Sequence, residues 1–203
     1  MKKPSSATLL DKNSSLSKQN REIRIGFDFD NVFVNNPPFI PDFVIDWIYK
    51  KKSKTLKYRM PGELEQKIRI LSHFPIFRHP IKYNIDALKE LHKSNYSLYL
   101  LSGRLGFLDK RTEHWLKKYP ITKYFQEIYF NLKNDQAHYF KDYYIKSLRI
   151  THFIDDDLDL LLYLAKENPN VSFFWINTSR FLKRYIPFDN IKEIKKISDI
   201  TNL

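Results

Sequence analysis

The chain contains no cysteine, and only four of its 203 residues are glycine. The lack of cysteine excludes a disulfide framework, a zinc site with thiolate ligands and a cysteine nucleophile. The glycines at positions 26, 62, 103 and 106 form neither a GxGxxG fingerprint nor a P-loop. The six histidines never have the spacing of an HExxH zinc motif. These familiar catalytic and nucleotide-binding signatures are therefore absent.

Long hydrophobic runs are also missing. The longest apolar run in the first 20 residues is the pair Leu9-Leu10, which does not make a signal peptide. Nothing later approaches the roughly 18 apolar residues of a membrane span. With 42% hydrophobic and 16% aromatic residues, the chain still has enough apolar surface to form a core. We therefore expect a soluble, cytoplasmic protein that does not associate with membranes.

Positive charge is in excess and unevenly distributed, with a formal net charge of +12. Residues 1–24 contribute +4 and residues 35–82 contribute +6, which leaves +2 for the rest of the chain. A basic tail and a basic insertion around a nearly neutral core indicate attraction to anionic partners such as nucleotides or nucleic acid. Solubility and a compositional preference for lysine explain the excess equally well, so both interpretations stay open.

The first part of the chain divides into three segments. Residues 1–21 are rich in Ser, Lys and Asn and have no periodicity, which predicts a flexible basic tail. Apolar residues then alternate from Ile23 to Phe29 and run on to Val34, as in a buried strand that ends in an irregular turn. Residues 36–82 predict a small helical insertion.

Within that insertion, Pro41 and Pro61 each open a stretch with apolar residues at helical spacing. The apolar positions of the second stretch are Leu64, Ile68 and Leu71.

From residue 83 onward, segments typical of helices and strands alternate. The predicted helices cover 84–94, with Asn84 as its cap, 107–119, 135–148 and 158–166, and the predicted strands cover 96–101, 127–132, 151–154 and 171–176. The segment 181–203 ends in a short helix or strand whose place the pattern does not give. Strands separated by helices of this length pair in parallel through right-handed crossovers. We therefore predict an α/β fold: a doubly wound, Rossmann-like parallel sheet built from residues 22–35 and 83–203, with the small helical insertion after its first strand.

Polar side chains follow three of these strands, at the point where each strand ends. In a doubly wound sheet, ligands bind beyond the carboxyl ends of the strands, so these side chains are expected to meet in one crevice. They are Asp28 and Asp30 after the first strand, Ser102 and Arg104, with Gly103 between them, after the second, and Asp155 and Asp156 after the fourth.

Carboxylates crowded together repel one another unless a cation or a changed protonation state relieves them. Because only oxygen ligands are at hand, Mg²⁺ is the favoured cation. Mg²⁺ beside a carboxylate suits phosphoryl transfer, in which the carboxylate attacks phosphorus and water hydrolyses the resulting aspartyl-phosphate. A second carboxyl two residues on can protonate the leaving alcohol and later activate the water.

The run Asp28-Phe29-Asp30-Asn31-Val32 resembles the DxDx[TV] motif of the haloacid dehalogenase (HAD) superfamily. Ser102 resembles its second motif, and Asp155-Asp156 resembles its acidic fourth motif, in the family's order. The resemblance spans about residues 25–178 and implies a phosphatase with Asp28 as nucleophile and Asp30 as general acid and base.

The resemblance also implies a cofactor and its ligands. Mg²⁺ would bind Asp28, the backbone carbonyl of Asp30, and Asp155 or Asp156. Ser102 and its neighbour Gly103 would hold phosphate oxygens.

The family's third motif is a lysine that contacts the phosphate. Lys141 has the spacing typical of members with two consecutive acids in the fourth motif. Lys146 and Lys133 are rivals for this position, and each of the three is equally compatible with a solvated lysine.

A finer resemblance covers Leu101-Ser102-Gly103-Arg104 and the later segment 111–116. These look like the SGR…TxxWL segment of nucleotide-directed HAD enzymes, including the polynucleotide 3′-phosphatase branch. Arg104 would bind a phosphate in a bidentate contact, through two parallel N–H donors of its guanidinium. Trp115 and Leu116 are expected to pack their helix onto the sheet.

The insertion at 36–82 resembles a small HAD cap, which excludes water and contacts the substrate. Basic and aromatic residues that alternate in this way can engage a phosphate and a base, although a lysine run at a helix end is also typical of a solvated surface. The residues concerned are Trp47, Tyr49, Lys50, Lys51, Lys52, Lys54, Lys57, Tyr58 and Arg59.

Three functional hypotheses follow. The first is a phosphomonoesterase, nucleotidase-like, acting on a nucleotide or another small phosphorylated metabolite. The second is a 3′-phosphatase acting on nucleic-acid ends, and the third is a non-catalytic module that binds nucleic acid or protein through its basic tail and insertion. Asp157 and Asp159 are expected to be first-turn helix acids rather than catalytic groups, and His73 and His79 to be surface or packing residues.

Overall fold

The computed structural model describes residues 22–36, 56–94, 96–178 and 184–200. The predicted tail over 1–21 and the helix predicted from Pro41 lie outside these residues. Within them, six strands form one sheet in the order β3-β2-β1-β4-β5-β6, and every neighbouring pair is parallel. The strands are β1 (Arg24–Phe27), β2 (Ser97–Ser102), β3 (Glu127–Phe130), β4 (His152–Asp155), β5 (Ser172–Ile176) and β6 (Ile191–Ile194).

Five α-helices accompany the sheet in the described part of the chain. They are α2 (Glu63–Ser72), α3 (Lys82–Lys93), α4 (Asp109–Lys118), α5 (Ala137–Ser147) and α6 (Leu158–Glu167). Three 3₁₀ turns, η1 (Gly106–Leu108), η2 (Thr122–Tyr124) and η3 (Ile197–Asp199), complete the set. None of these helices is long and apolar enough to cross a membrane.

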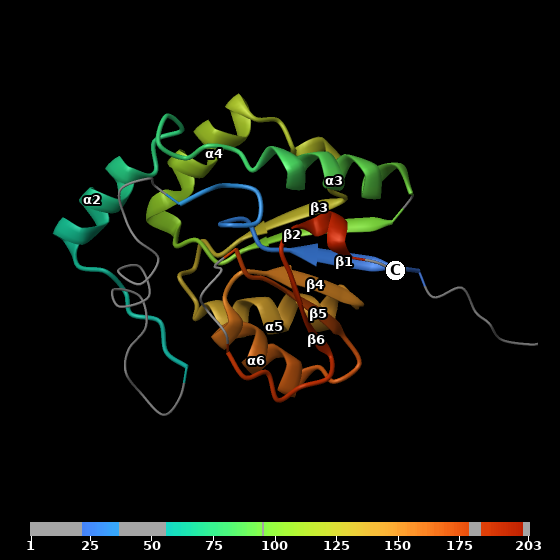
Figure 1. The fold of residues 1–203 in the computed structure, drawn as a ribbon. Helices are drawn as coiled ribbons and strands as arrows, with labels where there is room; N and C mark the ends of the chain where they lie inside the picture. The colour runs from blue at the N-terminus through green and yellow to red at the C-terminus, as the bar shows by residue number, and fades with distance from the viewer. Residues whose placement is uncertain (1–21, 37–55, 95, 179–183, 201–203) are drawn as a thin grey trace, which may run out of the picture.

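Helices cover both faces of the sheet, with α3 and α4 on one side and α5 and α6 on the other (Figure 1). The inner strands β1, β2, β4 and β5 therefore bury both of their faces, as their largely apolar sequences require. In β2, Leu98 and Leu100 join one core cluster, while Tyr99 and Leu101 join the other. The predicted doubly wound, Rossmann-like α/β fold is confirmed.

The segment 181–203, which the sequence pattern left unplaced, supplies the last strand and a short turn. Strand β6 pairs with β5 at the edge of the sheet, and η3 follows it. In β6 the two ends, Ile191 and Ile194, are buried, and the charged residues Lys192 and Glu193 between them are exposed. Charged residues of this kind are typical of an edge strand.

Helix α2 confirms the helix predicted from Pro61 and stands apart from the sheet, beyond the carboxyl ends of the strands (Figure 1). Its apolar residues Leu64 and Leu71 are exposed by 73% and 61% instead of packing into the main core. The attachment to α4 is polar: Arg111 Nε donates to the Ile70 carbonyl at 3.0 Å, and its guanidinium lies 3.5 Å from the ring centroid of Phe74.

Asn84 does not cap α3, and that prediction is wrong. The helix begins two residues earlier, at Lys82, and Asn84 is fully buried inside its first turn. Its Nδ2 donates to the Val32 carbonyl at 2.7 Å, and its Oδ1 accepts from Ile197 N at 2.9 Å. The side chain therefore joins the turn after β1 to the start of η3, a long-range role that local spacing cannot reveal.

We expect Asn84→Ala to lower the free energy of unfolding by roughly 2–4 kcal/mol, because it leaves a buried carbonyl and a buried amide without partners. Urea unfolding followed by circular dichroism measures this difference. Asn170→Ala, at an exposed position, is the control and should change stability by less than about 0.5 kcal/mol. Equal stability of the two variants would contradict the assigned role of Asn84.

Candidate active site

The site lies where the strand order reverses. Strand β1 has β2 on one side and β4 on the other. The strands that follow β1 therefore extend the sheet first in one direction, through β2 and β3, and then in the other, through β4, β5 and β6. A crevice forms at such a switch point. Here a pocket of about 850 Å³ opens beyond the strand ends, and its walls include Asp28, Gly103 and Asp155 from the three central strand ends.

Carboxylate oxygens of Asp28, Asp155 and Asp156 all lie within 4.8 Å of one another. Asp28 and Asp155 are buried, with 6% and 1% of their surface exposed. Lys141 Nζ lies between them, 2.6 Å from Asp28 Oδ1 and 2.6 Å from Asp155 Oδ2. We call these four residues the acidic cluster. Its members come from β1, β4 and α5, and only folding brings them together.

Of the three lysines considered for the third motif, the structure places Lys141 in the acidic cluster. Lys146 forms a surface ion pair with Asp142, one turn away on the same helix, and Lys133 is exposed. Whether Lys141 contacts a phosphate stays a prediction.

Burial sets the proton affinities in the acidic cluster. It raises the pKa of Asp28 to about 7, although the Lys141 ammonium opposes this and Asp155 adds to it. Burial likewise raises the pKa of Asp155 and Asp156. Burial disfavours the charge of Lys141 too, but Asp155 and Asp28 outweigh it and raise the pKa of the lysine. One ammonium thus faces three carboxyl groups, and a further cation would relieve them.

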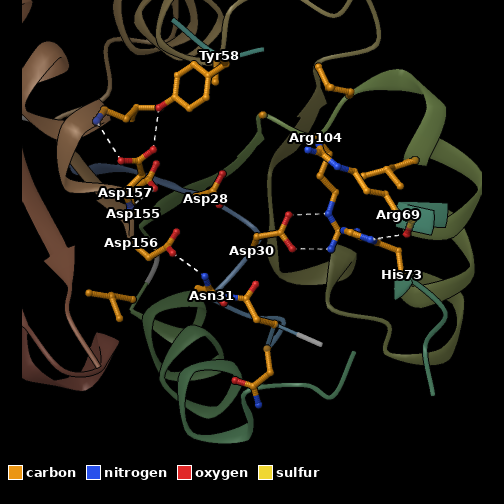
Figure 2. Close-up of a pocket in the computed structure, with 18 of the residues that line it drawn as sticks. Asp28, Asp30, Asn31, Tyr58, Arg69, His73, Arg104, Asp155, Asp156 and Asp157 are labelled. Atoms are coloured by element: carbon orange, nitrogen blue, oxygen red, sulfur yellow. Dashed lines mark hydrogen bonds and ion pairs between the residues drawn. The ribbon is translucent and has the colours of Figure 1, made fainter. Parts of the chain in front are cut away.

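The donor set fits Mg²⁺. The three carboxyl groups of the acidic cluster offer only oxygen atoms, which hard divalent cations prefer. Asp30 was predicted to bind the metal through its backbone carbonyl, and its carboxylate lies apart from the other three, paired with Arg104 (Figure 2). Among the predicted ligands, Asp28, Asp155 and Asp156 are therefore the carboxylates that the fold brings together.

Two groups that the sequence analysis did not single out hold Asp156. Asn31 Nδ2 donates to Asp156 Oδ2 at 2.6 Å, and Trp175 Nε1 donates to the Asp156 carbonyl at 2.9 Å. Asn31 adopts the left-handed conformation, with φ of 53°, which asparagine tolerates better than most residues. This tight turn after β1 points the amide of Asn31 across the crevice to β4.

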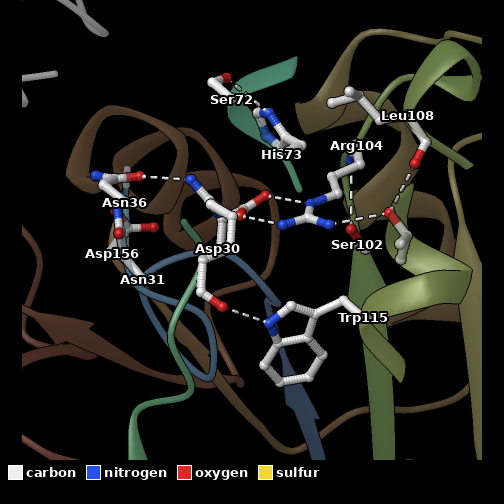
Figure 3. A network of polar contacts seen from close by, with 12 residues as sticks. Asp30, Asn31, Asn36, Ser72, His73, Ser102, Arg104, Leu108, Trp115 and Asp156 are labelled. Atoms are coloured by element: carbon white, nitrogen blue, oxygen red, sulfur yellow. Dashed lines mark hydrogen bonds and ion pairs between the residues drawn. The ribbon is translucent and has the colours of Figure 1, made fainter. Parts of the chain in front are cut away.

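Asp30 faces two arginines. Arg104 donates from Nε to Oδ2 at 2.7 Å and from Nη2 to Oδ1 at 2.6 Å, and Arg78 Nη2 also donates to Oδ1 (Figure 3). Burial alone would raise the pKa of Asp30, but Arg104 and Arg78 outweigh it and hold this pKa well below its usual range. In this state Asp30 is a carboxylate, and the predicted phosphate-binding Arg104 is engaged by it.

Arg78 was missed by the sequence analysis, because a single arginine between Phe77 and His79 has no pattern of its own. Its backbone carbonyl accepts from Trp115 Nε1 at 2.7 Å. Trp115 is 1% exposed and packs edge-on against Phe29 at 5.2 Å between ring centroids, so the predicted packing of α4 onto the sheet is confirmed.

Ser102 and Gly103 close the end of β2. Ser102 is buried, and its Oγ accepts from Arg104 N at 3.4 Å. A Cβ at Gly103 would come within 3.3 Å of Ala137 Cβ and 3.7 Å of Lys141 Cε. The glycine therefore lets the end of β2 approach Ala137, at the start of α5, more closely than a residue with a Cβ would. Phosphate binding by both residues stays a prediction.

The remaining polar residues have mainly structural contacts. Asp159 lies in the first turn of α6, as expected, whereas Asp157 precedes that turn as its N-cap. Asp157 accepts from Asp159 N at 3.0 Å and from Tyr58 Oη at 2.7 Å. His73 is buried, and its Nδ1 lies 2.7 Å from the Arg69 carbonyl. Burial, with Arg104 and Arg78 nearby, lowers the pKa of His73 to about 3. His73 is therefore a neutral packing residue in the pocket wall.

His79, in contrast, is exposed, in agreement with the prediction that it is a surface or packing residue.

Tyr58 ties the described end of the insertion to the core. Its backbone N–H donates to Gln136 Oε1 at 2.7 Å, and Gln136 Nε2 donates back to the Tyr58 carbonyl at 3.1 Å. Together with the contact to Asp157, these bonds place Tyr58 at the rim of the acidic cluster (Figure 2).

The fold is that of the haloacid dehalogenase hydrolases. A HAD phosphatase from Thermococcus onnurineus matches with a TM-score of 0.54 at 17% identity, over 87% of this chain and 95% of that one. The HAD hydrolase YfnB from Bacillus subtilis, solved with bound magnesium, matches with a TM-score of 0.55 at 14% identity, over 88% and 96%. A chain of a Pnkp1/Rnl/Hen1 complex matches with a TM-score of 0.50 at 16% identity, over 84% of this chain and 52% of that one. No protein-family model and no curated protein matches the sequence.

Proposed function

We propose that this protein is a magnesium-dependent HAD-type phosphomonoesterase that hydrolyses a nucleotide or another small phosphorylated metabolite through an aspartyl-phosphate. The observation that carries the proposal is the acidic cluster, in which Lys141 holds Asp28 and Asp155 on either side of the switch point. A HAD fold with this constellation at its crevice suits phosphoryl transfer.

The residues of the site divide the reaction between them. Asp28 attacks phosphorus, so a bond forms between its carboxylate oxygen and phosphorus while the bond to the leaving alcohol breaks. Asp30 gives a proton to that alcohol, then takes one from the water that hydrolyses the aspartyl-phosphate. Asp28, Asp155 and Asp156 would hold Mg²⁺, which neutralises phosphate oxygens so that an anionic nucleophile can approach.

The pairing of Asp30 with Arg104 and Arg78 affects the step in which Asp30 protonates the leaving alcohol. The guanidiniums keep the pKa of Asp30 low, which suits the base that activates water but not the acid that protonates the alcohol. In the proposed cycle, the bound substrate accepts hydrogen bonds from the guanidiniums in place of Asp30, and the carboxylate then takes up from water the proton that it delivers to the alcohol.

The test is phosphate release from sugar phosphates, nucleoside 5′- and 3′-monophosphates and 3′-phosphorylated oligonucleotides. We expect turnover of at least one small phosphomonoester with Mg²⁺, and none after chelation. Turnover that persists in excess chelator would sink the magnesium-dependent mechanism. A panel that stays uncleaved in both conditions would instead favour the non-catalytic binding module.

A second candidate is a 3′-phosphatase acting on nucleic-acid ends. Two observations favour it: the SGR…TxxWL resemblance around Arg104 and Trp115, and the structural likeness to a chain of a Pnkp1/Rnl/Hen1 complex. In the panel, preferential release from 3′-phosphorylated oligonucleotides would select this candidate over a metabolite phosphatase.

A further inference from the structure

The pocket has three aspartates together on one side and arginines on the other, where Glu65 pairs with Arg69. Figure 2 shows Asp155, Asp156 and Asp157 on one side and Arg104 and Arg69 on the other, with Asp28 and Asp30 between them. A substrate that fills this pocket therefore meets carboxylates at one end and guanidiniums at the other.

The position of Asp30 tells which part of a substrate meets the arginines. In the proposed reaction, phosphorus lies against Asp28 and the bridging oxygen lies against Asp30. What lies beyond Asp30 is the leaving group, and there Arg78 and Arg104 stand, both donating to the Asp30 carboxylate.

Both arginines are fixed in place before any substrate binds. Their side chains are 3% and 6% exposed. Arg104 Nη1 donates to Thr112 Oγ1 at 2.9 Å, and its guanidinium lies 4.5 Å from the ring centroid of Phe29. The backbone at Arg78 is held by the indole N–H of Trp115. Such a preorganised pair of guanidiniums matches the geometry of a phosphate oxyanion.

We infer that the substrate is a phosphomonoester whose leaving group carries a second phosphate, and that Arg78 and Arg104 bind this second phosphate. The inference depends on the proposed function, because it places the leaving group through the roles of Asp28 and Asp30. A free bisphosphorylated nucleoside and the phosphate-terminated end of an oligonucleotide offer the same chemistry.

Calorimetric titration of the full-length chain with Asp28→Asn, in the presence of Mg²⁺, tests the inference without turnover. The ligands are adenosine 3′,5′-bisphosphate, the 3′- and 5′-monophosphates, and a 3′-phosphorylated dinucleotide. We expect the bisphosphate to bind roughly 10- to 100-fold more tightly than either monophosphate, as a charge-assisted contact of this kind provides. The dinucleotide, whose second anion is a phosphodiester, shows whether a nucleic-acid end is preferred to the free bisphosphate.

Adding Arg78→Gln to this protein should reduce the preference for the bisphosphate to about threefold or less, and Arg104→Gln should do the same. Arg111→Gln is the matched control, since Arg111 also links the insertion to the core but contacts Ile70 and Phe74. It should keep the full preference. Equal affinities for mono- and bisphosphate in the starting protein would overturn the inference, as would an undiminished preference in the Arg78 and Arg104 variants.

Failure of the proposed function has a different signature. The chain with Asp28 intact would then release no phosphate from the bisphosphate with Mg²⁺, while the preference in binding persisted.

Discussion

Replacing Asp28 with asparagine is expected to lower the rate of phosphate release by roughly 10⁴-fold or more, because it removes the attacking group. The amide oxygen of asparagine can still accept a hydrogen bond from Lys141 Nζ, which now lies 2.6 Å from Asp28 Oδ1. The fold should therefore survive while the nucleophile is lost. Single-turnover kinetics on the best substrate of the panel, with Mg²⁺, measure the change.

Asp157→Asn is the matched control. Asp157 lies just after the neighbouring strand β4 but serves as the cap of α6, a position that asparagine fills about as well. This variant should retain the larger part of the activity. A comparable loss in both variants would indicate a general effect of charge at the site, and near-normal turnover with Asp28→Asn would rule out the covalent mechanism.

Replacing Lys141 with glutamine should have the largest effect on stability. The substitution leaves Asp28 and Asp155 buried without their cation, and breaking a buried ion pair in this way costs about 3–5 kcal/mol. The loss should be smaller in Mg²⁺, since a cation bound by the carboxylates replaces part of the missing charge. Urea unfolding with and without MgCl₂ measures both quantities.

Lys146→Gln serves as the comparison, because it removes an exposed pair with Asp142 on the same helix. Such a pair contributes about 0–1 kcal/mol. If Lys141→Gln proved as mild as Lys146→Gln, Lys141 would not be the compensating charge. If Mg²⁺ stabilised neither Lys141→Gln nor the unaltered protein, the acidic cluster would not be a metal site.

The sheet and its flanking helices were predictable from local pattern. The alternation of apolar strands with amphipathic helices from residue 96 to 176 is enough to define parallel pairing, and parallel pairing brings the ends of β1, β2 and β4 together. The meeting of Asp28 with Asp155 follows from that topology alone. No knowledge of side-chain conformations is needed.

Other features depend on contacts between distant segments that no local pattern encodes. Arg78 reaches Asp30 across 48 residues of sequence, and Asn84 reaches Ile197 across 113. Asn84 looked like a helix cap because asparagine serves equally well as a cap and as a buried side chain that hydrogen-bonds two distant segments. The choice of Lys141 over Lys146 likewise depended on which face of α5 packs against the sheet, and helix spacing alone leaves that open. Lys133 precedes the helix, and its exposed position was not encoded in the local pattern either.

The two tryptophans of the described structure give the site a built-in optical readout. Trp175 Nε1 is bonded to the Asp156 carbonyl, at the acidic end of the pocket, and Trp115 Nε1 is bonded to the Arg78 carbonyl, at the basic end. Indole emission responds to the polarity and hydrogen bonding around the ring. Fluorescence from Trp175 would therefore follow occupation of the acidic end, and fluorescence from Trp115 would follow the arginines. With Trp47→Phe as the background, Trp115→Phe or Trp175→Phe leaves a single tryptophan, so the order in which the two ends fill becomes observable without a label.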